Sequence, residues 1–512
     1  TTSRYGHMVH EWYVEQLRRV VTRRRERLAA LATKADAQRY VRRVRAAVRR
    51  CFAPFPPRTP LHAEVTGSRT HAKHVLETVV FASRPDFLVT GNLYIPRGLE
   101  GKAPAVMGLC GHSGTGKAEP KYQSFAQALV RKGFVVFVID PISQGERRQF
   151  YRKDGGPRPG LCHAHNHMGN PMVLLDDFFG TWRVWDAIRG LDYLLARPEV
   201  DRRHIGVTGN SGGGTLTTYL TALDPRLTMA APSCHISSFC TDLENELPRD
   251  AEQNPPGLLG AGLDSVDLLI AYAPRPTLIL AQIDDFFDER AARHASHDMK
   301  RVHKLLGTPS TAQYFAGTHA HGYHKENREA MVRFFMKHAG CRGPHKETGI
   351  RVRTPAELQA TSRGETHRAG SRRVFEFSAD HAAALSKQRR RLSRSALIQR
   401  ARRLLNLPRA RGVPPYRCLR GRQFAVETEP GVQALVSMFR PAPYDYHPPQ
   451  GPCMLYVGHT DSNEDAKTVK EIKRLSTKRG FLTVDPRGLG QTMAQTCGCH
   501  DFFAPYGSDY LY

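Results

Sequence analysis

The 512-residue sequence lacks several features that would restrict its class at once. No apolar run is long enough to cross a bilayer, so we expect no membrane span. The ten cysteines include no C-x-x-C pair, which argues against a zinc knuckle or a redox motif; Cys497 and Cys499 come closest. The first residue is Thr1 and no charged-then-apolar leader follows. The compartment is therefore unknown: secreted or periplasmic if a leader was removed, otherwise cytoplasmic.

Acidic residues are scarce, with 48 Asp and Glu against 75 Lys and Arg and a formal charge of +27. The basic residues gather in residues 1–50 and 386–422. Such tracts can attract nucleic acid, uronic-acid polysaccharide or a membrane surface. They lack the aromatic platforms of single-strand binding, so we favour solvated helix surfaces and expect no nucleic-acid partner.

Residues 204–215, H-I-G-V-T-G-N-S-G-G-G-T, are the stretch around which the chain is organised. A β-branched run meets a glycine cluster centred on Ser211, and residues 216–223 have a helical pattern. The core matches G-x-S-x-G, the nucleophile elbow that holds a serine oxygen clear of a sheet. The spacing alone is weak, but its strand-turn-helix context favours Ser211 as a nucleophile.

Buried strands and amphipathic helices alternate on both sides of this elbow. We expect helices in residues 11–51, hairpin strands in 74–96, and an irregular insertion in 236–268 that covers a pocket. Later strands are expected at 103–110, 134–140, 205–207, 227–234, 276–283 and 312–315, and helices at 122–131, 182–196, 288–306 and 327–337. This alternation predicts an α/β fold with a mostly parallel sheet.

The strand at 103–110 is followed by G-H-S-G-T-G-K, close to the phosphate-binding G-x-x-x-x-G-K-[ST] loop. Ala118 replaces the hydroxyl that would meet magnesium, and Pro120 interrupts the start of the helix. In an α/β-hydrolase, the loop after this strand instead supplies one N–H of the oxyanion hole. We favour that role, and we expect no nucleotide and no other cofactor.

A serine nucleophile needs a base, and the base needs a carboxylate that fixes its tautomer. Asp284 follows a later strand, and His321 follows the last strand, which is the chain order of α/β-hydrolases. We expect these two residues to complete the triad. The rivals are Asp285 and Asp288 for the acid, each also able to cap the next helix, and His319 and His324 for the base.

Other polar residues are expected to line the substrate pocket. His112 and Gln144 follow strands at the edge where α/β sheets bind ligands. Three alternating histidines, His163, His165 and His167, could converge on a metal if the segment is extended. No matching carboxylate or cysteine cluster accompanies them, so we expect no metal site and assign His165 to the pocket.

These motifs together resemble the acetyl xylan esterase-like branch of the α/β-hydrolase superfamily. The likeness runs to about Gly340, through C-G-H-S-G-T-G-K, D-P-I-S-Q-G-E-R, R-P-E-V-D-R-R-H-I-G-V-T-G-N-S-G-G-G and H-G-Y-H-K-E-N-R-E-A-M. The resemblance implies hydrolysis of carboxylic esters, typically acetyl groups on plant polysaccharides. It implies Ser211 as nucleophile, His321 as base and an acid at the Asp284 position. It also implies an oxyanion hole formed by the N–H of Gly212 and an N–H of the His112-Ser113 turn, for which we expect Ser113 to be the donor.

The second half of the chain repeats part of the first. F-R-P-A-P at 439–443, G-P-C-M-L-Y-V-G-H-T at 451–460 and F-L-T-V-D-P-R-G-L-G at 481–490 parallel earlier segments at an offset of 345 to 347. No second elbow, acid or base follows, so the copy is either truncated or degenerate; an unpaired central strand would favour truncation. We expect an N-terminal helical extension (1–72), a catalytic domain (73–340), a linker (341–373) and a partial second module (374–512).

The first functional hypothesis is a serine esterase acting on acetylated polysaccharide such as xylan, or on a small ester. A peptidase or a uronate-ester hydrolase of the same fold is an alternative, and the basic charge favours an acidic substrate. A third reading is a non-catalytic polyanion-binding protein on a hydrolase scaffold, which the triad candidates argue against. The acyl group, the sugar and the oligomeric state do not follow from the sequence.

Overall fold

A computed structural model describes residues 5–52, 54–153, 161–247, 249–389, 391–406, 412–419, 422–439, 451–478 and 480–493. Cys497, Cys499 and most of the 439–443 motif lie outside these residues. The chain forms two compact units, Val20–Ala384 and Thr1–Arg19 with Leu385–Gly507, which are described separately. None of the helices in the described ranges has the length and apolar character needed to span a bilayer.

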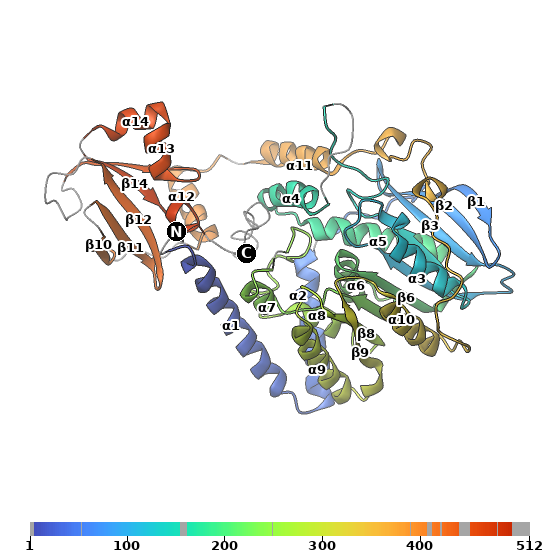
Figure 1. Ribbon diagram of the computed structural model, residues 1–512. Coiled ribbons are helices and arrows are strands. Elements are labelled where there is room, and N and C mark those ends of the chain that lie inside the picture. Colours follow the sequence, from blue (N-terminus) through green and yellow to red (C-terminus); the bar gives the residue numbers. More distant parts are fainter. Residues whose placement is uncertain are drawn as a thin grey trace. The chain divides into compact units, whose positions relative to one another are not determined.

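The larger unit is built on a nine-stranded sheet with the order β1-β2-β3-β5-β4-β6-β7-β8-β9 (Figure 1). The strands are β1 Glu64–Thr70, β2 His74–Arg84, β3 Phe87–Pro96, β4 Ala103–Leu109, β5 Val135–Ile139, β6 Val200–Asn210, β7 Met229–Ser233, β8 Thr277–Asp284 and β9 Ala312–Ala320. The pairs from β1 to β5 are antiparallel and those from β5 to β9 are parallel. This confirms the expected mostly parallel sheet, whose carboxyl edge gathers the loops that bind ligands.

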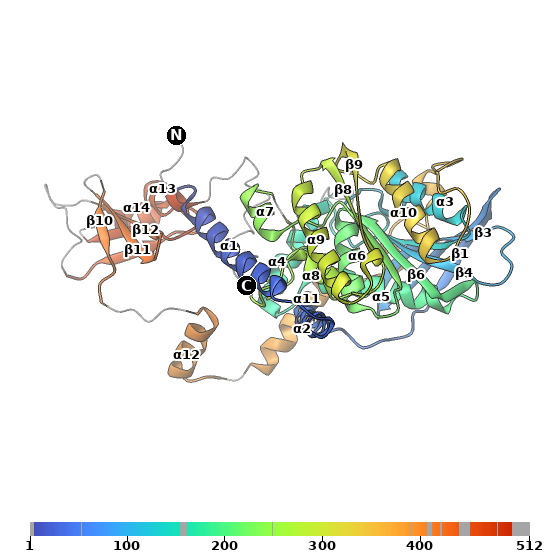
Figure 2. The same ribbon diagram turned by 90° about the horizontal axis from the view of Figure 1, so that it is seen from below.

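Helices cover both faces of this sheet, as its continuously apolar strands require. In β5, Val136 and Val138 pack with α3 and α10, whereas Val135, Phe137 and Ile139 pack with the opposite helices. Figure 2 shows α3 and α10 on one side of the sheet and α5 on the other. The helices are α2 Lys34–Phe52, α3 Pro120–Val130, α4 Leu161–Met172, α5 Phe179–Ala196, α6 Gly212–Leu223, α7 Phe239–Glu244, α8 Ser265–Ile270, α9 Glu289–Leu305 and α10 Lys325–His338.

Several basic residues of the N-terminal helices attach those helices to the larger unit. α1 spans Met8–Ala29, and its Arg24 donates to Asp267 of α8 over 2.5 Å. Tyr40 of α2 donates to the same carboxylate over 2.9 Å, and Arg45 donates to the carbonyl of Ala271 over 2.8 Å. Part of the basic tract at 1–50 is therefore used within the fold.

The structure corrects two of the expected domain boundaries. The N-terminal extension (1–72) includes β1, whose seven residues are all exposed and so carry no alternating apolar signal. The expected linker (341–373) lies against the larger unit: Leu358 is buried, and the N–H groups of Ala360 and Thr361 donate to Glu146 over 2.8 and 2.7 Å. We call this segment the strap. It packs on the unit because Leu358 is buried and the Glu146 carboxylate accepts hydrogen bonds from its backbone.

The smaller unit contains a five-stranded sheet with the order β10-β11-β12-β14-β13. Its pairings match those of β1-β2-β3-β5-β4: three antiparallel pairs, then one parallel pair. The Ser462 N–H donates to Asp485 over 3.0 Å, as the Lys117 N–H donates to Asp140 over 2.8 Å in the first sheet. We propose on these grounds that this sheet is the repeat predicted from the sequence.

The elements of the smaller unit are short. Its strands are β10 Tyr416–Cys418, β11 Gln423–Glu429, β12 Val432–Phe439, β13 Met454–Val457 and β14 Phe481–Asp485, and its helices are α12 Arg394–Leu404, α13 Ser462–Thr468 and α14 Lys470–Ser476. α11, Val374–Gln388, begins in the larger unit at the buried Val374. α12 and the end of α11 lie in the basic tract at 386–422.

Candidate active site

Ser211 sits in the strained turn that the G-x-S-x-G motif predicts. It joins β6 to α6 with φ 59° and ψ −125°, a conformation that costs energy for a residue with a Cβ. A Cβ on Gly209 or Gly213 would lie 2.3 or 2.2 Å from the Leu109 carbonyl oxygen, so both positions require glycine. The Ser211 N–H donates to the Ser233 carbonyl over 2.9 Å, which fixes the turn.

The start of α6 provides the donor expected from Gly212. Gly212 is the first residue of this helix, and the first N–H groups of an α-helix have no partner within it. They also lie at the positive end of the helix dipole, which favours a developing oxyanion. The N–H of Gly212 therefore lies at the start of α6, next to Ser211 in the chain.

The other expected donor, Ser113, is corrected by the structure. Its N–H already donates to the side-chain oxygen of Gln144 over 2.5 Å. Gln144 therefore braces the turn after β4, and the N–H of His112, the preceding residue, is left as the alternative donor in that turn. Sequence spacing could not distinguish two adjacent N–H groups.

His321 is paired with Asp285 rather than with the expected Asp284. The His321 Nδ1 lies 2.8 Å from a carboxylate oxygen of Asp285, whose side chain is 1% exposed, and the ring of Phe286 stacks on the imidazole. Asp284 is exposed as the last residue of β8. Neighbouring residues at a strand end point in opposite directions, so extending the predicted strand by one residue exchanges the two carboxylates.

The loop that carries His321 is hydrogen-bonded to β6, which precedes Ser211, and to the residue that follows β7. The Tyr323 hydroxyl lies 2.7 Å from the Thr208 hydroxyl of β6, and the Cys234 thiol after β7 donates to the Gly322 carbonyl over 3.3 Å. Among the described residues, Ser211 and His321 are not directly hydrogen-bonded. Catalytic hydrogen bonds are often long before substrate binds, so this does not remove His321 from consideration.

The rival residues have other partners. His319 lies in β9 with its Nε2 3.0 Å from Glu326, and the His324 ring packs on His319 with centroids 4.5 Å apart. Asp288 caps α9 by accepting from the Arg290 N–H over 2.9 Å. Each is therefore explained without a catalytic role.

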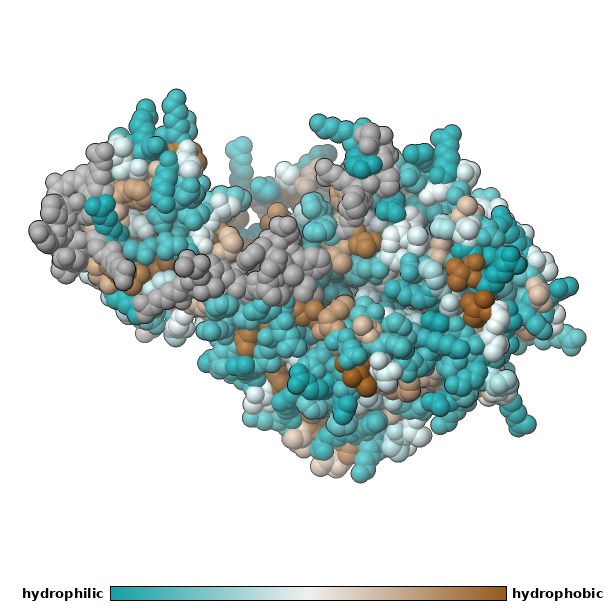
Figure 3. All heavy atoms as spheres, viewed as in Figure 1, coloured by the Kyte–Doolittle hydropathy of each residue, from teal (hydrophilic) through white to brown (hydrophobic). Residues whose placement is uncertain are grey.

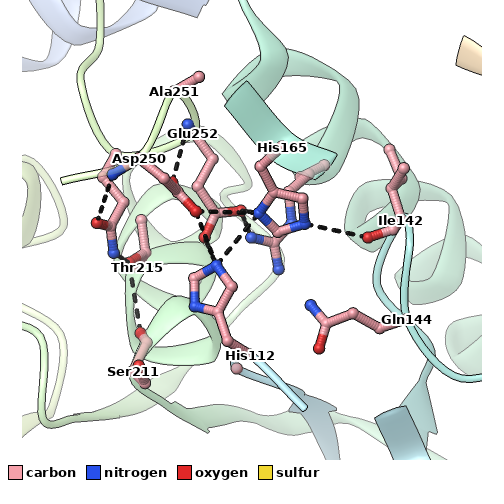
Figure 4. Close-up of polar contacts among 12 residues, drawn as sticks. His112, Ile142, Gln144, His165, Ser211, Thr215, Asp250, Ala251 and Glu252 are labelled. Carbon is pink, nitrogen blue, oxygen red and sulfur yellow. Dashed lines mark hydrogen bonds and ion pairs between the residues drawn. The ribbon is translucent and has the colours of Figure 1, made fainter. Parts of the chain in front are cut away.

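Four polar side chains converge beside the elbow, as Figure 4 shows. His112 follows β4, His165 lies on α4, and Asp250 and Glu252 lie between α7 and α8. One oxygen of Asp250 is 2.7 Å from His112 Nε2 and 3.0 Å from His165 Nδ1, and those two nitrogens are 3.2 Å apart. The structure thus brings two expected pocket residues, His112 and His165, together.

No motif in the sequence points to the two acids of this group. Asp250 and Glu252 belong to the segment interpreted as an irregular insertion, and D-A-E in a loop is common. The histidines were expected on an extended segment, but α4 is a helix, so His165 is buried while His163 and His167 are exposed. Alternate residues of an extended segment point to the same side, whereas alternate residues of a helix point in different directions.

The pKa values of His165 and His112 are shifted in opposite directions. Burial lowers the pKa of His165 to about 4, against the hydrogen bond and charge of Asp250. Burial also opposes protonation of His112, but Cys162 and Asp250 raise its pKa to about 10. The guanidinium of Arg183 contacts Glu252.

The lysine of the phosphate-loop-like motif is used inside the fold. Lys117 is buried, and its ammonium lies 2.6 Å from Asp140 and 2.5 Å from Glu146. Burial alone would lower its pKa, but these two carboxylates raise it. The ion pairs with Asp140 and Glu146 account for the lysine of this motif.

Comparisons with known proteins find similarity over the larger unit. Residues 60–245 match the family model of acetyl xylan esterase (AXE1). The "Putative hydrolase YtaP" of Bacillus subtilis (strain 168) is 24% identical over 247 residues, covering 46% of this chain and 78% of that protein. The "Uncharacterized protein PA2218" of Pseudomonas aeruginosa is 29% identical over 150 residues, 29% of this chain and about a third (34%) of that protein.

Among solved structures, "Methylesterase BT1017" aligns with a TM-score of 0.58 and 21% identity, covering 73% of this chain and 80% of its own. At this identity the likeness concerns the fold, which agrees with the mostly parallel sheet and the strand-turn-helix elbow. Residues 60–245 are thus similar to the acetyl xylan esterase family, and the larger unit has the α/β-hydrolase fold.

Proposed function

We propose that the larger unit is a serine esterase with Ser211 as nucleophile, His321 as base and Asp285 as the acid that orients it. The observation that carries the proposal is the strained Ser211 at the start of α6, with a paired His321 and Asp285 on the neighbouring strand ends. Burial of Asp285 excludes water from the pair, which strengthens its hold on the imidazole. Three residue types in this order, each at a strand end, are more specific than any one motif.

The reaction follows from the roles of these groups. His321 takes the proton of the Ser211 hydroxyl as the oxygen attacks the ester carbonyl, and Asp285 stabilises the imidazolium. The N–H groups of Gly212 and His112 donate to the oxyanion that forms. His321 then protonates the departing alcohol, and water releases the acid from the acyl-enzyme by the reverse steps.

The family match favours an acetyl ester of a polysaccharide as the substrate. The methylesterase named among the structural neighbours makes a methyl uronate the second candidate. The face of the chain that Figure 3 shows is mainly polar. Acetylated xylan and methyl-esterified polygalacturonate separate the two, because they release acetate and methanol respectively.

We expect acetate release from acetylated xylan to exceed methanol release from the polyuronate by at least about tenfold in kcat/KM, because the sugar is the leaving alcohol in the first ester and the acyl part in the second, so one pocket cannot hold both equally well. Chromatographic measurement of both products checks this with the full chain. A peptide 4-nitroanilide serves as the peptidase control. Faster methanol release would move the proposal to the uronate ester, and faster anilide cleavage would replace the esterase assignment.

A further inference from the structure

The group of His112, His165, Asp250 and Glu252 is hereafter called the His-acid cluster. We propose that the His-acid cluster binds one divalent transition-metal ion, for which zinc fits the donor set, beside the Ser211 turn. The ligand atoms of all four residues lie within 4.8 Å of one another. Imidazole nitrogen and carboxylate oxygen are common zinc ligands. The inference goes beyond the proposed esterase reaction and does not depend on it.

The spacing of the donor atoms matches a small tetrahedral ion. Bonds of about 2.0–2.1 Å from a tetrahedral zinc place its ligands about 3.3 Å apart. In the cluster, the distances from Asp250 to the two imidazoles and between the imidazoles are 2.7, 3.0 and 3.2 Å. Glu252 lies 3.5 Å from His112 Nε2 and 3.6 Å from His165 Nδ1. The expected ligand–ligand distance of about 3.3 Å lies within the range of these five distances.

The tautomer of His165 supplies an independent argument. Its Nε2 is 3.2 Å from the Ile142 carbonyl oxygen, which can only accept, so this nitrogen carries the hydrogen. In neutral His165, the lone pair of Nδ1 then faces an Asp250 oxygen 3.0 Å away. Two acceptors at this distance repel unless a cation lies between them. A second ring nitrogen donating to a backbone carbonyl is also the usual support of a metal-bound histidine.

A proton on His112 is the alternative to a metal ion, but it interacts with fewer of the four side chains. That proton can be shared between Asp250 and His165, but the Glu252 oxygens lie 3.5 and 3.6 Å from the imidazole nitrogens, too far for a strong hydrogen bond. Arg183, the cation that contacts Glu252, offsets one of the two carboxylate charges. With Arg183 counted, a divalent ion would leave the cluster with one net positive charge while coordinating all four side chains.

The location of the cluster would allow an ion to enter from solvent and to act near the Ser211 turn. The side chains of His165, Asp250 and Glu252 are at most 1% exposed, whereas that of His112 is 15% exposed. A Cβ placed on Gly212 would lie 2.8 Å from Glu252 and 2.9 Å from His112, so the cluster borders the start of α6. An ion there would fasten three separate segments around the elbow and place positive charge near the substrate.

The test is metal binding by the full chain, measured apart from ester turnover. After removal of metals with a chelator, we expect calorimetric titration with zinc chloride to give one ion per chain, and added zinc to raise the Tm by mass action. Asp250→Asn and His165→Ala should each weaken zinc binding about 100-fold or more and abolish the Tm increase. Far-UV circular dichroism of Asp250→Asn, which preserves side-chain shape, verifies that it is folded.

His163→Ala is the matched control, because His163 and His167 form an exposed i, i+4 pair on the same helix that can itself bind zinc. This variant should bind zinc as the wild type does. Absence of zinc binding by the wild type, or binding lost in His163→Ala but kept in Asp250→Asn, would overturn the proposal. In the first case the cluster is held by a proton on His112, and in the second the surface pair binds the ion; neither result bears on Ser211.

Discussion

A Ser211→Ala variant should lose at least about 10³-fold in kcat for a small chromogenic acetate ester, because no other group takes the place of the attacking oxygen. The loss should fall on kcat more than on KM, since the hydroxyl acts in the chemical step. Initial rates over a range of ester concentrations separate the two constants. Ser310→Ala, at an exposed position far along the chain, is the matched control and should retain full activity.

Equal rates for Ser211→Ala and the wild type would remove Ser211 as nucleophile. The Tm of the variant serves as a second readout. Because Ser211 carries a positive φ, a smaller side chain there should leave the fold intact, so a change of rate reports on chemistry.

An Asp285→Asn variant should lose on the order of 10³- to 10⁴-fold in kcat, because an amide at this position favours the wrong tautomer of His321. The adjacent Asp284→Asn provides the matched control: the same substitution one residue away, on an exposed carboxylate. We expect Asp284→Asn to remain within about twofold of the wild type. Steady-state kinetics of the two variants on the same acetate ester decide between the two carboxylates.

The opposite order, with Asp284→Asn inactive and Asp285→Asn active, would contradict the contact seen between Asp285 and His321. If both variants stayed active, neither carboxylate would be the acid of the triad. His321→Ala then distinguishes a base acting without an acid from a different base altogether.

The sequence predicted the parts of the site that local geometry dictates. Ser211 was found because only glycine fits at Gly209 and Gly213, where strand and helix approach closely. The strands of the sheet were found because they are buried on both faces and read as continuous apolar runs. Strong local requirements leave a pattern in the sequence.

The parts that were missed depend on tertiary contacts or on single-residue boundaries. The choice between Asp284 and Asp285 depended on where β8 ends, which is uncertain by more than one residue from a pattern alone. Asp250 and Glu252 meet His112 and His165 across more than 80 residues, and no spacing reveals such a contact. The strap at 341–373 reads as a linker because its partners, including Glu146, lie elsewhere in the chain.

The most direct test of the catalytic assignment is covalent labelling of the full chain with a phosphonofluoridate, followed by mass spectrometry of its peptides. Such reagents react with a serine that a neighbouring base has activated. We predict one adduct, on Ser211, absent from Ser211→Ala and formed more slowly in Asp285→Asn. An adduct on another serine, or no adduct on a chain that hydrolyses the ester, would contradict the account.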